Sequence, residues 1–409
     1  MSAAAPTYGF AWRGAMAHSH AGRLLRRLAV ARLLEGLAAG SVLVALPFSV
    51  ASCDRSGVFG TFSEPVLTGL LVSAFGIALA VGQWLAVVAA RRIALERIAL
   101  GGLLLFAISM SLLALTRDYS QIIALRVVQG LSAALAAPTS VALASALAPS
   151  HRRGAALGFY SSMKMLGISL GPALGGLSLM VLTPSQTYWL SSSLLIVASL
   201  PYVADYAVAS LERREIPQQV VAVRPTSALV LAAFVASSCA TSLLVLQNQL
   251  AQQFSGASSL GFGLAASGML VARAVLNWPI GRWCDSRRPG VLAVIGLLVL
   301  GSATIASGLV EQFSALIIAR VVMGIGMALF ATPALVVAAA RDGRGRCDSV
   351  GAIGAGFAAG VGVGPLVTGV LGAHLGSSAT FVIWGTTAIA LACAVLRSMR
   401  VGANASPAR

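Results

Sequence analysis

Charged side chains are scarce in this sequence. Of its 409 residues, 10% are charged and 58% are hydrophobic, and the mean hydropathy is +0.89. A soluble domain is about one quarter charged and just under half apolar, so this chain cannot bury its apolar surface within one water-soluble globule. Acidic residues number only 12, and Lys164 is the single lysine. The composition therefore predicts an integral membrane protein and argues against a soluble enzyme.

Other features of functional sites are also missing from the sequence. The five cysteines include no Cys-x-x-Cys pair and no histidine-interleaved cluster, so we expect neither a metal site nor disulfides. The HExxH, GxSxG and Walker lysine motifs are absent, so we expect no catalytic site and no cofactor. Aromatic residues make up 6% of the chain, too few for an extended aromatic cage. Residues 1–22 lack the apolar core of a signal peptide and are expected to form an uncleaved tail.

Long apolar segments recur along the rest of the chain. A membrane-spanning helix needs about 20 mostly apolar residues. Backbone groups without partners are costly in lipid, so spanning segments are helices or closed barrels. The segments are too long and too poor in alternation for barrel strands. The sequence predicts an all-α integral membrane fold with twelve transmembrane helices, at about residues 30–52, 66–89, 94–115, 120–148, 155–181, 187–208, 227–250, 260–280, 290–310, 314–340, 349–372 and 378–396.

The basic residues indicate how these helices are oriented. Of 28 basic residues, 22 lie at or before the first segment, in alternate loops or in the C-terminal tail, whereas only Arg55 and Arg117 lie in the opposite loops. Positive residues remain on the cytoplasmic side. We therefore expect both termini in the cytoplasm and an even number of spans, in the inner (plasma) membrane of a bacterium. The net charge of +16 is explained by this topology, so nucleic acid is not an expected partner.

The two halves of the chain resemble each other. Arg126-Val-Val-Gln-Gly recurs as Arg320-Val-Val-Met-Gly, and the glycine pattern that ends in Pro172 recurs before Pro365. Two related six-helix bundles are typical of secondary transporters, which bind substrate between the repeats. The expected organisation is an N-terminal tail, a six-helix bundle, a cytoplasmic linker, a second six-helix bundle and a C-terminal tail, at residues 1–22, 23–208, 209–226, 227–398 and 399–409.

One glycine-rich pattern resembles a known family. Its defined positions match the antiporter motif of the major facilitator superfamily, which is associated with drug/proton antiporters; they are Gly158, Gly167, Gly171, Pro172, Gly175 and Gly176. Glycines four residues apart share one helical face and allow another helix to approach closely. The pattern is also compatible with a packing seam that carries no meaning for export.

Two further motifs support the resemblance. Arg126, Gln129 and Gly130 are similar to the family's RxxQG motif. The stretch from Gly281 to Arg288 is similar to its cytoplasmic gating motif. In that motif Asp285 is the carboxylate expected to pair with cations such as Arg287. The first-half copy of the gating motif keeps Arg91 but has Ala86 where the acid belongs. The resemblance to the gating motif is therefore incomplete in the first half.

Glu35 is the candidate for proton coupling. It lies twelve residues before Pro47 in the first segment and is similar to the embedded carboxylate of some multidrug/proton antiporters. An ionisable side chain inside the membrane by default marks a pathway, a relay or a paired lock. Glu35 is expected to face Arg126. A fixed pair with Arg126 or Arg32 that only stabilises the bundle is an equal alternative.

Buried cations are the candidates for substrate binding. Lys164 and Arg273 lie at similar depths in the fifth and eighth segments and have no obvious acidic partner nearby. Two such cations favour an anionic or carboxylate-bearing substrate. The alternative is that each reaches the interface or pairs with a carbonyl or with Glu35. The complete set of expected substrate contacts is Lys164, Arg273, Asn277, Arg320 and Gln129.

Together these patterns predict a monomeric secondary transporter in the lipid bilayer. The leading interpretation is proton-coupled efflux, by antiport, of a small organic molecule or drug. The alternative is a proton-coupled symporter or exchanger of a small organic anion. An intramembrane enzyme lacks any supporting motif, and a repeated architecture fits alternating access better than a channel.

Overall fold

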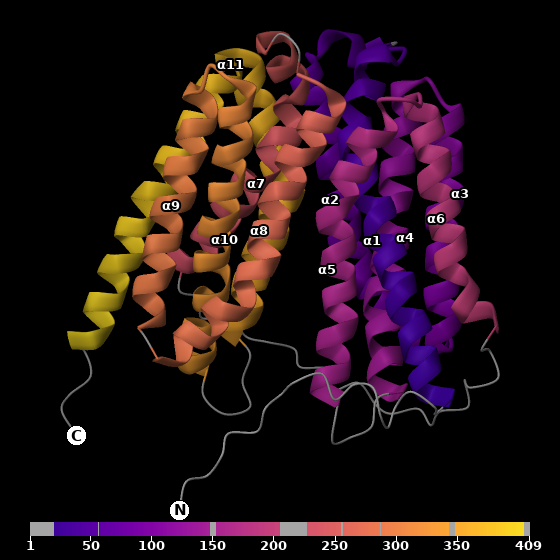
Figure 1. Ribbon diagram of the computed structural model, residues 1–409, viewed down its shortest axis with the longest axis horizontal. Coiled ribbons are helices and arrows are strands. Elements are labelled where there is room, and N and C mark those ends of the chain that lie inside the picture. Colours follow the sequence, from indigo (N-terminus) through magenta and orange to yellow (C-terminus); the bar gives the residue numbers. More distant parts are fainter. Residues whose placement is uncertain are drawn as a thin grey trace, which may run out of the picture.

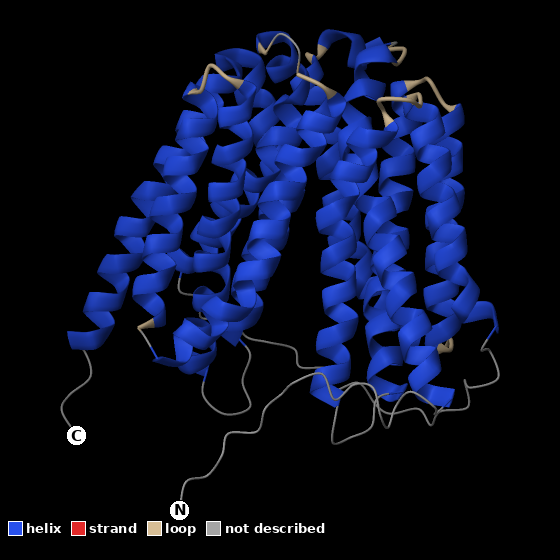
Figure 2. Ribbon diagram, in the orientation of Figure 1, coloured by secondary structure: helices blue, strands red, loops and turns tan. Residues whose placement is uncertain are grey.

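The computed structural model describes residues 20–55, 57–147, 153–204, 227–254, 257–286, 288–342 and 348–404. These residues form helices and short connections, and no strand occurs among them (Figure 2). The elements are α1 (His20–Ser52), the 3₁₀ helix η2 (Gly57–Thr61), α2 (Glu64–Ala90), α3 (Leu95–Leu115), α4 (Tyr119–Leu147), α5 (Arg153–Ser178), α6 (Pro184–Ala204), α7 (Ser227–Gln253), α8 (Ser259–Ser286), α9 (Pro289–Leu309), α10 (Phe313–Asp342) and α11 (Asp348–Asn404).

The described residues thus contain eleven α-helices, one fewer than expected. Nine of them are long and apolar enough to cross a membrane, and α5 and α6 are the two that are not. The difference in number arises in α11, where the two expected segments are joined into one 57-residue element. Gly376, with φ 81° and ψ 172°, interrupts the helical geometry between them. This left-handed conformation is accessible to glycine because it has no Cβ.

The helices form two bundles with separate cores (Figure 1). The first, α1–α6, is built around buried residues that include Leu28, Leu71 and Phe106. The second, α7–α11, has its own cluster, which includes Leu297, Phe330 and Trp384. The boundary between these two clusters thus lies between α6 and α7. The expected linker at 209–226, most of the expected N-terminal tail and residues 405–409 of the expected C-terminal tail lie outside the described residues.

The two bundles approach each other at the end away from the chain termini (Figure 1). An apolar cluster joins them there and contains Val44 from α1 together with Leu246 from α7 and Phe262 from α8. The α2–α11 and α5–α8 pairs also cross the boundary between the bundles. We call this region the closed end.

Toward the opposite end, the surfaces that face across the boundary are exposed. Pro172 and Gly176 of α5 lie against α8, whereas Met165, on the same face about two turns earlier, is 50% exposed. In α2, Gly69 and Gly76 lie against α11, and Gln83 farther along is exposed. The bundles are thus packed together at the closed end and apart toward the end that carries the chain termini (Figure 1).

Candidate functional site

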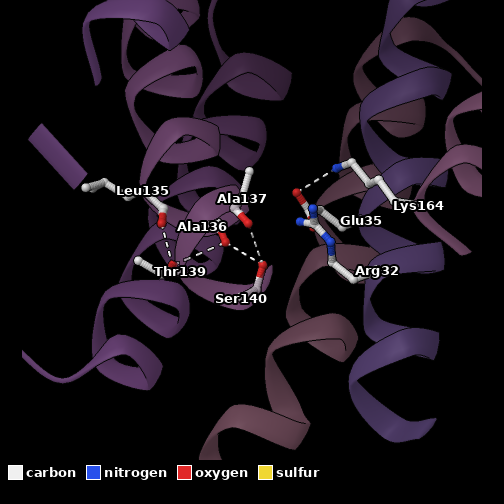
Figure 3. A network of polar contacts seen from close by, with 8 residues as sticks. All are labelled: Arg32, Glu35, Leu135, Ala136, Ala137, Thr139, Ser140 and Lys164. Atoms are coloured by element: carbon white, nitrogen blue, oxygen red, sulfur yellow. Dashed lines mark hydrogen bonds and ion pairs between the residues drawn. The ribbon is translucent and has the colours of Figure 1, made fainter. Parts of the chain in front are cut away.

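Glu35 is the centre of a buried charge cluster. Its Oε2 accepts a hydrogen bond from Arg32 Nη1 at 2.5 Å, and its Oε1 accepts one from Lys164 Nζ at 2.7 Å (Figure 3). The side chains of Arg32 and Glu35 are 7% and 3% exposed, and that of Lys164 is 17% exposed. Two cations thus share one carboxylate, and we call Arg32, Glu35 and Lys164 the charge triad.

Close packing of α1 on α5 brings the triad together. A Cβ on Gly36 would lie 2.9 Å from the Gly167 Cα, and one on Gly171 would lie 2.6 Å from the Gly40 Cα. These glycines let the two helix backbones nearly touch, as small residues do between membrane helices. Glu35 directly precedes Gly36, and Lys164 lies one turn before Gly167. The same seam therefore holds the carboxylate beside the ammonium group.

The contacts of these charges match the alternatives that the sequence left open, and not the leading expectations. Lys164 does have an acidic partner, because Glu35 comes from a different helix. Glu35 is paired with Arg32 and Lys164, and not with Arg126. Arg126 instead donates from Nη1 to Gln129 Oε1 at 2.8 Å and from Nε to the Leu71 carbonyl at 3.3 Å. Its guanidinium also lies 4.6 Å from the centroid of the Phe75 ring.

Gln129 and Arg320 are fixed inside their own bundles. Gln129 is 0% exposed and donates to Met110 Sδ at 3.4 Å in addition to accepting from Arg126. Arg320, 1% exposed, donates to the Ala240 carbonyl at 2.8 Å, to the Cys239 carbonyl at 3.4 Å and to Met269 Sδ at 3.2 Å. The repeat-related arginines, Arg126 and Arg320, are therefore both held by neutral groups.

Arg273 differs from the other buried cations. It lies within α8 and is mostly buried, and it has no hydrogen bond or ion pair with any described residue. Asn277, one turn farther along α8, accepts a hydrogen bond at Oδ1 from the Thr332 hydroxyl of α10 at 3.3 Å. These two residues share one side of the helix, as expected from their spacing.

The antiporter-motif residues pack in two directions. Gly167, Gly171 and Gly175 face α1, where a Cβ on Gly175 would overlap the Ser41 carbonyl. Gly176 and Pro172 face α8, where Ser259 donates its hydroxyl to the Gly176 carbonyl at 3.0 Å. Gly158 lies in the first turns of α5, and its surroundings are outside the described residues. The motif thus forms both a seam within one bundle and part of the boundary between bundles.

The gating-motif residues lie at the other end. Gly281 and Asp285 fall in the last turns of α8, and Arg91 is exposed directly after α2. The side chain of Asp285 and all of Arg287 lie outside the described residues, so the expected pairing there stays a prediction. In the described part of the chain, no three His, Cys, Asp or Glu side chains are grouped in a way that could hold a metal ion.

The sequence named Arg32 only as an alternative partner of Glu35. Arg32 lies at the start of the first expected span, and the structure shows it buried in α1 and paired with Glu35. The i,i+3 spacing of the two residues fits that pair. The sequence did not point to Ser73 and Ser267, whose hydroxyls accept backbone N–H groups across the boundary between bundles. Serines are frequent, and no local pattern marks these two.

Comparison with known proteins supports a transporter. The chain matches the Major Facilitator Superfamily over residues 28–246 and 226–408. It is 31% identical over 108 residues to the quinolone resistance protein NorA of Staphylococcus aureus, which is 26% of this chain and 28% of that protein. It is 30% identical over 169 residues to the lincomycin resistance protein LmrB of Listeria monocytogenes, 37% of this chain and 36% of that protein. The matches span about a third of these relatives.

Solved structures share the fold over nearly the whole chain. The peptide transporter POT aligns with a TM-score of 0.76 at 13% identity, covering 94% of this chain and 96% of that one. The nucleoside transporter NupG aligns with a TM-score of 0.67 at 13% identity, covering 91% and 99%. The helical repeat, the motifs and these matches agree, and the protein is a multi-pass membrane transporter rather than an enzyme. The chain belongs to the major facilitator superfamily.

Proposed function

We propose that the protein exports a small organic molecule or drug in exchange for protons. The observation that carries this proposal is the charge triad, in which one buried carboxylate is shared by two cations. Glu35 is the only acidic residue in the interior of a described helix, since the other described acids lie at helix ends or in loops. The antiporter motif and the partial similarity to NorA and LmrB support export.

The triad offers a physical route for coupling. Protonation of Glu35 removes the charge that holds Arg32 and Lys164, so both contacts weaken together. Because Glu35 and Lys164 come from α1 and α5, the proton changes the attraction between two helices. The side chain of Lys164 is 17% exposed, and in this proposal water and protons reach the triad through it. A change of local charge at a two-state interface is the usual basis of such switching.

Alternating access requires the bundles to rock about their boundary. In the proposed topology, Gly376 divides α11 into two spans, so the nine apolar helices supply ten spans. The helices α5 and α6 supply the other two, which makes twelve. The arginine-rich loops and both termini lie on the cytoplasmic side of a bacterial plasma membrane. The bundles are apart toward that side, so the described state is the one open to the cytoplasm. We propose that the protein functions as a monomer.

The remaining candidate residues form the wall of the proposed central site. Arg273 and Asn277 are proposed to contact substrate directly. Lys164, Arg126, Gln129 and Arg320 supply its buried polar and charged surroundings. At the cytoplasmic end, Asp285 and Gly281 with Arg287 and Arg91 are proposed to form the gate that closes when the protein opens outward.

An alternative function is symport or exchange of a small organic anion, and one observation favours it. Five cations with buried or partly buried side chains lie in the described helices, against the one buried carboxylate of Glu35, namely Arg32, Arg126, Lys164, Arg273 and Arg320. Protonation of Glu35 would free Lys164 to bind an anion, so proton and anion would bind together. Antiport requires the reverse, in which substrate and proton displace one another.

Flux through purified protein in liposomes tests the proposal. An imposed proton gradient should drive uptake of a substrate against its concentration gradient in the direction opposite to the proton. Glu35→Gln should retain downhill exchange and lose its response to pH, because the amide cannot release a proton. The control is Arg117→Gln, because Arg117 is an exposed loop residue. Proton-driven transport that is unchanged in Glu35→Gln would contradict the role of this carboxylate.

A further inference from the structure

We infer that Arg273 is the anchor for an acidic group on the substrate, so that the transported molecules carry a carboxylate or a similar oxyanion. The inference rests on the proposed transport function and specifies the substrate class of the same site. It starts from Arg273, the one partly buried cation that has no hydrogen bond or ion pair with another described residue.

The position of Arg273 follows from the exposed side of α8. Leu264, Val275 and Trp278 are 45%, 66% and 71% exposed and mark the lipid-facing stripe. Arg273 is nine residues after Leu264, and at about 100° per residue the two point in opposite directions. Its side chain therefore leaves α8 on the side turned away from lipid.

The helices that pack against α8 show which of them the Arg273 side lies near. Gly263 and Ser267 face α5 of the other bundle, and Met269 faces Arg320 of α10. Arg273 lies between these two directions. It is six residues beyond Ser267, or about 9 Å along the axis, on the part of the helix where the bundles are no longer packed together. Arg273 is thus on the inner side of α8, near the boundary between bundles.

The other four buried cations are already engaged. Arg32 and Lys164 share Glu35. Arg126 and Arg320 are held by amide, carbonyl and thioether groups. Among the described residues nothing of this kind reaches Arg273. Arg273 is partly buried and unpaired among the described residues, so an incoming anion would offset the cost of its partial removal from water. This is the physical reason to assign the ligand to Arg273 and not to Lys164.

Asn277 supplies a second donor next to Arg273. Its Oδ1 accepts a hydrogen bond from the Thr332 hydroxyl, whereas its amide nitrogen has no partner among the described residues. A guanidinium beside an amide N–H matches the two oxygens of a carboxylate. The cationic excess within the helices favours the same sign of ligand, because it repels cations and attracts anions.

Ligand binding without a proton gradient tests this assignment. The probes are 1-naphthoate, its neutral amide 1-naphthamide and the cation 1-naphthylmethylammonium, which share one ring system. Affinity for the full-length protein in detergent is measured by competition and by ligand-dependent thermal stabilisation. The wild type should bind the carboxylate best. Arg273→Gln should weaken carboxylate binding about tenfold or more, the size expected for one charge-assisted hydrogen bond, and leave the amide nearly unchanged.

Two further variants separate charge from folding. Arg273→Lys keeps the charge and loses the planar guanidinium. Its affinity for the carboxylate should therefore lie between that of the wild type and that of Arg273→Gln. Arg117→Gln removes an equal charge from an exposed loop and should leave the carboxylate preference intact. The melting temperature without ligand verifies that each variant folds.

The outcomes distinguish this inference from the proposed function. A wild type that does not prefer the carboxylate, or an Arg273→Gln variant that keeps the preference, overturns the assignment even if proton-driven export is found. Loss of the preference in Arg273→Gln supports it even if transport proves independent of protons.

Discussion

The Ser267 hydroxyl oxygen accepts a hydrogen bond from the backbone N–H of Ala173 at 2.8 Å, across the boundary between the two bundles. Ser73 accepts one from the N–H of Leu366 at 3.0 Å in the equivalent place. Each N–H belongs to the residue that follows a helix proline, Pro172 or Pro365. A proline disturbs the hydrogen bonds around it, and serine hydroxyls can satisfy groups freed in this way. The sequence repeat thus produces two matching contacts at the closed end.

Removal of either serine should loosen the closed end. Ser267→Ala and Ser73→Ala each leave an N–H without its partner, at a cost of about 1 kcal/mol, or about fivefold in the equilibrium between closed and open arrangements. Distances between spin labels at the far ends of α2 and α11 would measure this shift. Ser193→Ala is the control, because that exposed hydroxyl bonds only within its own helix, to Leu190. Unchanged distance distributions in both variants would contradict the role of these contacts.

The seam between α1 and α5 should not tolerate a methyl group. In Gly171→Ala the new Cβ would lie 2.6 Å from the Gly40 Cα, and backbone cannot move aside as a flexible side chain can. Overpacking of this kind costs about 1–3 kcal/mol or more. We expect a lower melting temperature in detergent and separation of Glu35 from Lys164. Gly101→Ala, with nothing within 4 Å of the added Cβ, should be neutral or slightly stabilising, since alanine favours helices. Equal melting temperatures for the two variants would argue against a tight seam.

Much of the fold could be predicted from the sequence, because membrane helices are marked by local composition. The division into two halves followed from repeated motifs such as Arg126-Val-Val-Gln-Gly. The merged α11 was missed, since the conformation of Gly376 depends on its surroundings and not on a local pattern. Of the site, the buried positions of Glu35, Arg126 and Arg320 agree with the prediction that they lie inside helices.

The sequence offered the pairs of Glu35 with Arg32 and with Lys164 only as alternatives, because the register between helices decides which partner is present. Gly36 and Gly40 in α1 are four residues apart, as are Gly167 and Gly171 in α5. Matching these pairs would have brought Glu35 beside Lys164. The antiporter motif lies within α5 alone, and the sequence of a single helix carries no information about which partner faces its glycines. Arg273 has no hydrogen-bonding partner among the described residues. The direction of its side chain follows only from the exposed side of α8.

The triad should respond unequally to the loss of its members. Glu35→Gln leaves Arg32 and Lys164 adjacent without a shared anion, whereas Lys164→Gln leaves Glu35 with Arg32 at 2.5 Å. Removing one partner from a buried pair costs about 3–5 kcal/mol, so Glu35→Gln should lower the melting temperature more than Lys164→Gln. The double variant should be more stable than Glu35→Gln alone, because it removes one of the two stranded cations. Additive losses in the double variant would show that Glu35 and Lys164 act independently.

Asn248 should stabilise the closed end, because its side chain makes two hydrogen bonds across the boundary between bundles. Its Nδ2 donates from α7 to the Pro47 carbonyl at 3.0 Å and to Glu64 Oε2 at 3.2 Å, and Arg55 binds the other oxygen of Glu64 at 2.8 Å. Asn248→Ala removes both bonds between the bundles, worth about 1–3 kcal/mol, and should speed hydrogen exchange of backbone amides near Pro47 about fivefold or more. Asn248→Asp should have a larger effect, since a second carboxylate beside Glu64 repels it. Gln253→Ala is the matched control, because that amide bonds to Ser377 within its own bundle. Exchange that is equally slow in Asn248→Ala and Gln253→Ala would mean that Asn248 does not help to hold this end closed.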